Sequence, residues 1–130
     1  MGEGVFTREA GDFEIAVERP SEGTSVVAVR GEADLHSAPE LRDRLGTVID
    51  AGAQRVLVDL TETTFIDSMA LGVLLGSTKR LRANGGRLEL IVAQPDIRRI
   101  FEITMLDRIL EIHPSREAAL GLANGGRDPV

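Results

Sequence analysis

The spacing of apolar residues along this chain alternates between the period of a strand and that of a helix, and this alternation constrains the fold most. Residues 13–19 alternate apolar side chains with acids, as in a half-buried strand, and a turn at 20–24 leads into a second strand at 25–31. Further strands, each after a helical segment, are predicted at 55–60, 87–93 and 108–112. This order predicts an α/β domain with a mostly parallel five-stranded sheet, an N-terminal hairpin and about four helices.

Capping signals indicate where the helices begin and end. Ser37-Ala38-Pro39-Glu40 has the form of a capping box, and Asp67 is placed to cap the next long helix. That helix is predicted to end at the Asn-Gly-Gly of residues 84–86. Gly72 and Gly76 share one of its faces, and we expect them to let it lie close to the sheet. Its buried stripe is predicted to be Leu71, Leu74, Leu75 and Thr78, and shorter helices are predicted to start at Pro95 and Pro114.

Length, charge and composition restrict the class of protein. The 130 residues suit one domain, which we place at residues 10–122, with 1–9 and 123–130 as flexible termini. A net charge of -6 argues against nucleic-acid binding, and the absence of cysteine excludes disulfides and thiolate chemistry. The longest apolar run, residues 69–76, is too short to span a bilayer. We expect a cytoplasmic protein without membrane contact, either a monomer or a weak dimer.

Two segments follow strands at the edge of the predicted sheet where ligand sites of α/β proteins gather. They cover residues 31–40 and 61–68 and carry Asp34, Asp67 and Ser68. The glycines of a nucleophile elbow are missing around Ser68, so a catalytic serine is not favoured. Asp34 and Asp67 together are an alternative site for a small ligand, a magnesium ion or an enzyme reaction, but a loop acid and a helix cap explain them more simply. We expect no enzyme activity, no cofactor and no bound metal.

The segments "VDLTETTFIDSMALGVLLG" and "RRIFEITMLDRILEI" resemble bacterial anti-sigma factor antagonists of the STAS domain family. The resemblance extends from "VAVRGEADLHSAPEL" to "IHPSREAAL", nearly the whole chain. It implies that the protein binds an anti-sigma factor with serine kinase activity and thereby frees a sigma factor for transcription. In this family the kinase phosphorylates a serine or threonine at the start of a helix, which ends the complex, and a serine phosphatase reverses the reaction.

One residue departs from the family motif Asp-Ser-Ser/Thr-Gly/Ala-Leu-Gly. The matching residues here are 67–72, and Met69 occupies the position of the phosphoacceptor. Methionine cannot be phosphorylated, and an exposed methionine can bury against a partner. The resemblance implies that the partner-binding residues are Asp34, Ser37, Asp67, Ser68, Met69 and Ala70.

Three interpretations of Met69 stay open, and the first is preferred. In the first, the protein is a constitutive antagonist that is not switched off. In the second, Ser68 takes the phosphate, although its side chain points about 100° around the helix from position 69. In the third, the domain is an unregulated interaction module outside sigma-factor control. An engineered replacement of serine or threonine would give the same sequence.

Overall fold

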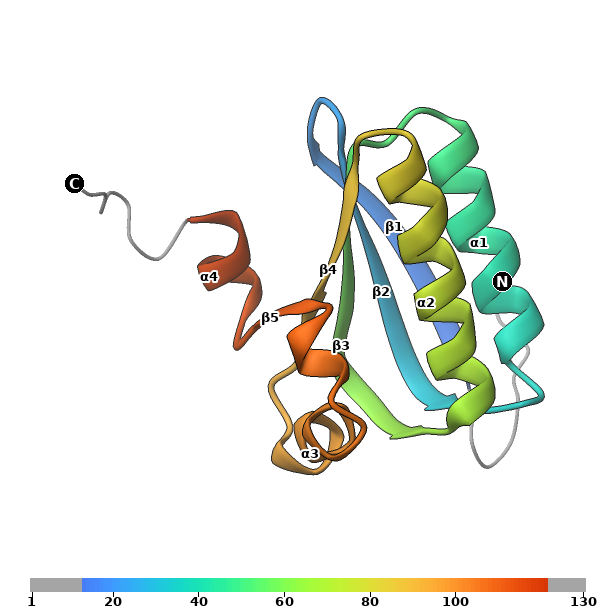
Figure 1. Ribbon diagram of the computed structural model, residues 1–130, viewed down its shortest axis with the longest axis vertical. Coiled ribbons are helices and arrows are strands. Elements are labelled where there is room, and N and C mark those ends of the chain that lie inside the picture. The colour runs from blue at the N-terminus through green and yellow to red at the C-terminus, as the bar shows by residue number, and fades with distance from the viewer. Residues whose placement is uncertain (1–12, 122–130) are drawn as a thin grey trace, which may run out of the picture.

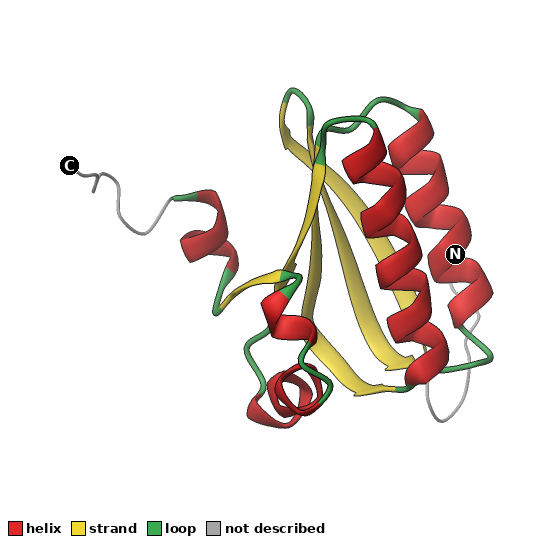
Figure 2. Cartoon of the chain, in the orientation of Figure 1, coloured by secondary structure: helices red, strands yellow, loops and turns green. Residues whose placement is uncertain are grey.

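A computed structural model describes residues 13–121, and its centre is a sheet of five strands in the order β1-β2-β3-β4-β5 (Figures 1 and 2). The strands are β1 (Phe13–Ser21), β2 (Thr24–Ala33), β3 (Arg55–Ile66), β4 (Arg87–Ile91) and β5 (Glu111–His113). The helices are α1 (Ala38–Asp50), α2 (Ser68–Ala83), α3 (Pro95–Ile103) and α4 (Arg116–Leu120), with a 3-10 turn, η2, at Leu106–Arg108. The predicted termini, 1–9 and 123–130, lie outside the described residues, as do the ends of the predicted domain.

The sheet is mixed and mostly parallel. β1 pairs with β2 antiparallel, whereas β2 with β3, β3 with β4 and β4 with β5 are parallel. In this register Val27, Val58 and Leu90 are neighbours on three adjacent strands, so their side chains share one face. This arrangement confirms the predicted fold class and the N-terminal hairpin.

The two faces of the sheet are covered unequally. α1 and α2 lie side by side along one face, and α4 lies on the other (Figure 1). The first face holds the main core, where Val58 and Leu90 pack with Leu45, Leu74 and Phe101 of the helices. The second face has a small apolar cluster of Val26, Leu57, Ile91 and Ala119. None of the helices described is long and apolar enough to cross a membrane.

Both strands that lead to the predicted site are longer than the sequence indicated. We expected them to end near residues 31 and 60, but pairing continues to Ala33 and Ile66, which are opposite each other. Irregularities after Ala28 and Gly31 absorb the change of register. The polar residues of 61–64 hid this extension because three of the four side chains are exposed. Only short connections therefore separate β2 from α1 and β3 from α2.

The last strand begins later than predicted. Residues 108–112 were expected to form it, whereas β5 covers Glu111–His113. The backbone N–H groups of Ile109 and Leu110 both donate to the carbonyl of Leu106, at 3.0 and 2.9 Å, and are not available to a sheet. Leu110 is buried from this turn, which explains the strand-like apolar pattern.

The two glycines of α2 do not face the sheet. Gly72 and Gly76 are exposed, and a Cβ atom on either would meet nothing within 4 Å. The prediction that they allow close packing on the sheet was therefore wrong. Leu75 is half-buried rather than buried. The glycine that close packing does require is Gly86, where a Cβ would lie 2.4 Å from the Gln54 carbonyl oxygen. The side chains that α2 buries are Ala70, Leu71, Leu74, Ser77, Thr78 and Leu81.

Candidate functional site

The carboxylate of Asp67 holds together the corner where β3 turns into α2. Its Oδ1 accepts hydrogen bonds from the backbone N–H groups of Met69 and Ala70, at 2.9 and 3.2 Å. Its Oδ2 accepts from the backbone N–H of Leu35 at 3.0 Å, across 32 residues of sequence. Asp67 is thus the predicted helix cap and also the link between α2 and the loop after β2.

Asp34 and Ser37 fold that loop onto itself. The Asp34 Oδ1 accepts from the backbone N–H groups of His36 and Ser37, at 2.9 and 3.1 Å. Burial raises the pKa of Asp34, but these backbone hydrogen bonds outweigh it and leave the pKa below its usual value. The Ser37 hydroxyl donates to the Glu32 carbonyl at 2.8 Å and makes no capping bond to α1. The predicted capping box was wrong in this respect, because the hydroxyl is engaged in the loop.

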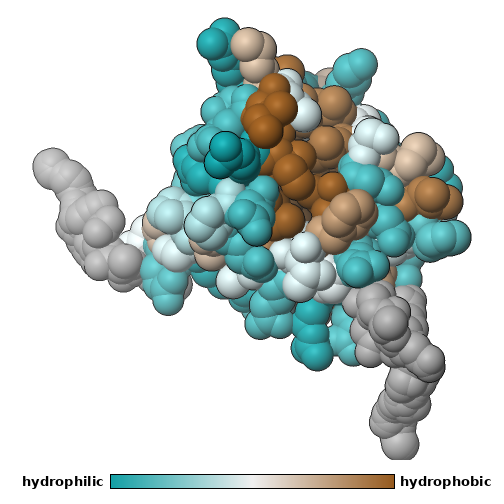
Figure 3. Space-filling model, turned by 90° about the horizontal axis from the view of Figure 1, so that it is seen from below, coloured by the Kyte–Doolittle hydropathy of each residue, from teal (hydrophilic) through white to brown (hydrophobic). Residues whose placement is uncertain are grey.

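Apolar side chains surround this linked corner and face solvent. Leu35 is 57% exposed, Phe65 47% and Met69 57%. Figure 3 views the end of the molecule where β2 and β3 finish, and apolar side chains gather there in one area. Large apolar residues that are exposed together are typical of surfaces that bind another molecule.

The structure places the predicted partner-binding residues at different depths. Asp34, Asp67, Ser68 and Met69 lie at the surface or half-buried. Ser37 and Ala70 are buried in the unbound chain, so their predicted part in partner binding stays a prediction. They lie beneath the surface because one holds the loop and the other begins the core face of α2. Sequence reasoning missed Leu35 and Phe65, whose apolar character in two polar stretches was the available signal.

The acids of the corner are engaged by the backbone. Backbone N–H groups donate to Oδ1 of Asp34 and to both carboxylate oxygens of Asp67. Within residues 13–121 the one group with metal-ligand spacing lies elsewhere, at Glu89, Glu111 and His113. There the Glu89 carboxylate is already bonded to two arginines, whose positive charge opposes a bound cation.

A family model, the STAS domain, matches residues 16–119. The chain belongs to the STAS domain family. The corner built around Asp67, with Met69 in the first turn of α2, lies within the matched residues.

Similar proteins within this family are named for one role. The anti-sigma-B factor antagonist of Bacillus subtilis (strain 168) is 32% identical over 102 residues, which cover 78% of this chain and 93% of that protein. An anti-sigma factor antagonist from Mycobacterium paratuberculosis has a similar structure, with a TM-score of 0.77 at 28% identity, covering 84% of this chain and 92% of that one. Unphosphorylated SpoIIAA, another anti-sigma factor antagonist, gives a TM-score of 0.73 at 26% identity, covering 88% and 100%. The phosphorylated form of SpoIIAA, from Bacillus, is also a solved relative.

Replacing Asp67 with alanine should lower the free energy of unfolding by about 1–2 kcal/mol, because the first turn of α2 loses its cap and Leu35 loses its partner. Asp67→Asn should recover part of this, since an amide oxygen still caps a helix. Urea denaturation of both variants is the measurement. An Asp67→Ala midpoint equal to that of the wild type would contradict the role assigned to this carboxylate.

Proposed function

We propose that this STAS protein is an anti-sigma factor antagonist that binds an anti-sigma factor with serine kinase activity and so frees a sigma factor. The observation that carries the proposal is the exposed apolar corner of Leu35, Phe65 and Met69. The resemblance implies that Met69 stands at the family's phosphoacceptor position. Relatives named as anti-sigma factor antagonists support it. Sigma factors act in the cytoplasm, so the proposal places this protein there.

The proposal includes constitutive binding. A phosphate at the start of α2 would be tolerated by the positive end of the helix dipole. It would also add about two negative charges beside Asp67, on the surface that the partner contacts, and so favour release. Met69 offers no hydroxyl for that reaction and instead presents an apolar side chain for burial. A constitutive antagonist needs no phosphatase.

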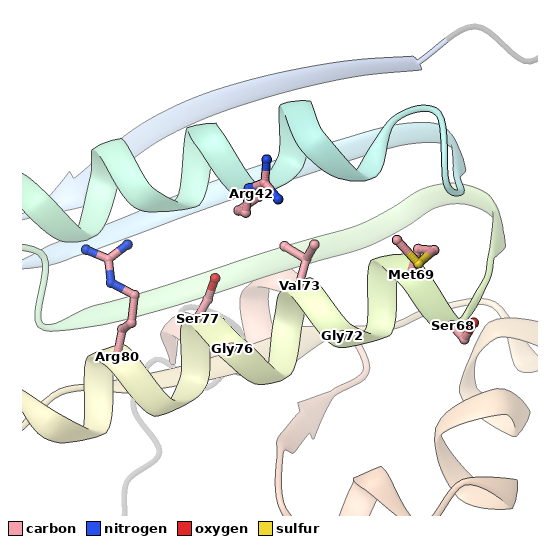
Figure 4. Close-up of a pocket in the computed structure, with 8 residues that line it drawn as sticks. All are labelled: Arg42, Ser68, Met69, Gly72, Val73, Gly76, Ser77 and Arg80. Carbon is pink, nitrogen blue, oxygen red and sulfur yellow. The ribbon is translucent and has the colours of Figure 1, made fainter.

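Ser68 is a poor substitute for the missing acceptor. It is exposed, so a kinase has access to it. In Figure 4, however, Met69 points toward α1, whereas Ser68 points away from it. A kinase that positions residue 69 at its phosphate donor would meet the Ser68 hydroxyl in the wrong direction. The alternative of a small-ligand or enzyme site at Asp34 and Asp67 has no supporting observation, since both carboxylates are engaged.

The test is incubation with purified anti-sigma factors of the same genome, with and without ATP. We expect a stable complex in both conditions and no phosphate in the mass spectrum. A phosphate that disappears in Ser68→Ala would show that Ser68 is the acceptor and would overturn constitutive binding. Failure of every anti-sigma factor to bind would favour the unregulated interaction module.

A further inference from the structure

A groove of about 470 Å³ lies between α1 and α2. It begins at the apolar corner, at the start of α2, and extends along the helix. Residues of α2 from Ser68 to Arg80 line one side, and Arg42 of α1 lies on the other (Figure 4). The α2 part covers three turns of helix, a length of about 18 Å. Met69 belongs both to the corner and to the groove, so the two surfaces are continuous.

The exposed glycines of α2, Gly72 and Gly76, line this groove, and packing within the fold does not require them. Apart from proline, glycine is the residue least favourable in the interior of a helix. A side chain at Gly72 or Gly76 would meet no atom of the protein within 4 Å, so packing does not require glycine there. Small residues four apart on a helix allow a second backbone to approach closely. The feature is explained if a second helix packs against α2 from outside.

A buried hydroxyl in the groove lacks a partner. Ser77 is 6% exposed, and its hydroxyl has no hydrogen bond within the described part of the chain. The hydroxyl of the next residue, Thr78, donates to the Leu74 carbonyl at 2.7 Å. A hydroxyl on α2 can therefore bond to the carbonyl four residues earlier, but that of Ser77 does not. Figure 4 shows the Ser77 oxygen on the side of α2 that faces α1. A buried, unpaired hydroxyl is unfavourable, and a polar group entering the groove would satisfy it.

The charged residues of the groove indicate which charges a partner helix should carry. Arg42 and Arg80 are the charged residues that line it, in a chain with a net charge of -6. Their acid contacts are at the surface, with Asp43 at 3.9 Å and Asp50 at 2.6 Å. A second copy docked groove to groove would bring arginine toward arginine, which is repulsive. A helix with carboxylates flanking an apolar face is complementary.

We propose that the groove binds a helix of the anti-sigma factor. Small or apolar side chains of that helix would pack on Gly72 and Gly76, and one of its polar groups would bond to the Ser77 hydroxyl. Its carboxylates would pair with Arg42 and Arg80. This rests on the proposed function and adds a second contact beside the Met69 corner. The corner and the groove together bind one partner.

The decisive variant is Gly76→Leu, which fills the groove while replacing a poor helix residue. We expect the thermal midpoint to rise and affinity for the anti-sigma factor, measured by calorimetry, to fall at least about tenfold. Ala83→Leu is the matched control, because it adds the same side chain to an exposed position of α2 outside the groove. Its affinity should stay within about twofold of wild type.

Two further variants, Arg80→Glu and Ser77→Ala, test the inference if Gly76→Leu folds poorly. Arg80→Glu should weaken binding about tenfold, whereas Lys79→Glu, exposed and outside the groove, should not. Ser77→Ala should weaken binding while the thermal midpoint holds or rises, because the unpaired hydroxyl is removed. Unchanged affinity in all three groove variants would overturn the inference and leave the proposed function standing. If wild type binds no anti-sigma factor, the proposed function fails, and this inference fails with it.

Discussion

Met69→Ser is expected to turn the protein into a substrate of its anti-sigma kinase and to release it from the complex once phosphorylated. Under the proposed function, the new hydroxyl would stand at the acceptor position, in the first turn of α2. Like charges brought together in an interface cost several kcal/mol, so affinity should fall by about 100-fold or more on phosphorylation. Mass spectrometry and binding with and without ATP measure the two events.

Met69→Ala is the control for this experiment. It removes the same apolar side chain without supplying a hydroxyl, so any loss of affinity must be equal with and without ATP. Met69→Ser that binds the kinase and stays unmodified would show that the surface no longer positions residue 69 for transfer. Adding Ser68→Ala to Met69→Ser assigns the phosphate to one of the two hydroxyls.

Removing the carboxylate of Glu89 should cause the largest loss of stability. This acid of β4 is 3% exposed and accepts hydrogen bonds from Arg55 at 2.8 Å, from Arg87 and, at 2.9 Å, from His113. Arg55 also donates to the Ala119 carbonyl of α4 at 2.7 Å. Glu89→Ala would leave Arg55 partly buried without its counter-ion, at an expected cost of about 3–5 kcal/mol in urea denaturation. Glu111→Ala, an exposed acid on the neighbouring strand, should cost less than about 0.5 kcal/mol.

The same carboxylate should make stability depend on pH in the acid range. Burial raises the pKa of Glu89, but hydrogen bonds from Arg55, Arg87 and His113 outweigh it and lower the pKa to about 2, from 4.5. A lowered folded-state pKa contributes stability that is fully present above pH 4.5 and is lost as the pH falls toward 2. The contribution is about 3 kcal/mol. If the free energy of unfolding depends on pH in the acid range equally in the wild type and in Glu89→Ala, this role of Glu89 is refuted.

The elements that local patterns determine were predictable from the sequence. Strand and helix periods gave the order of elements, Asp67 was identified as a cap, and Gly85 closes α2 with a positive φ of 80°, as the Asn-Gly-Gly signal indicated. These features depend on residues within a few positions of one another, where sequence alone carries the physical information.

The features that depend on tertiary neighbours were not predictable. The Ser37 hydroxyl had two possible uses, and the loop geometry selected the carbonyl of Glu32 over a helix amide. The glycines of α2 gave a spacing but not the direction of the face, which Leu74 and Leu81 set by packing on the sheet. Glu89 looked like an ordinary strand acid, because its partners come from β3, from its own strand and from β5.

Asp67 bonds to the backbone at position 69, and this has a consequence for how such proteins diverge. From residue 69 the carboxylate requires only the backbone N–H, which every amino acid except proline supplies, while more than half of the side chain there is exposed. Folding therefore places almost no demand on the identity of this residue. A lineage can exchange a hydroxyl for a methionine, or the reverse, in one substitution without losing the fold. Under the proposed function, regulation can be gained and lost here far more readily than the domain that bears it.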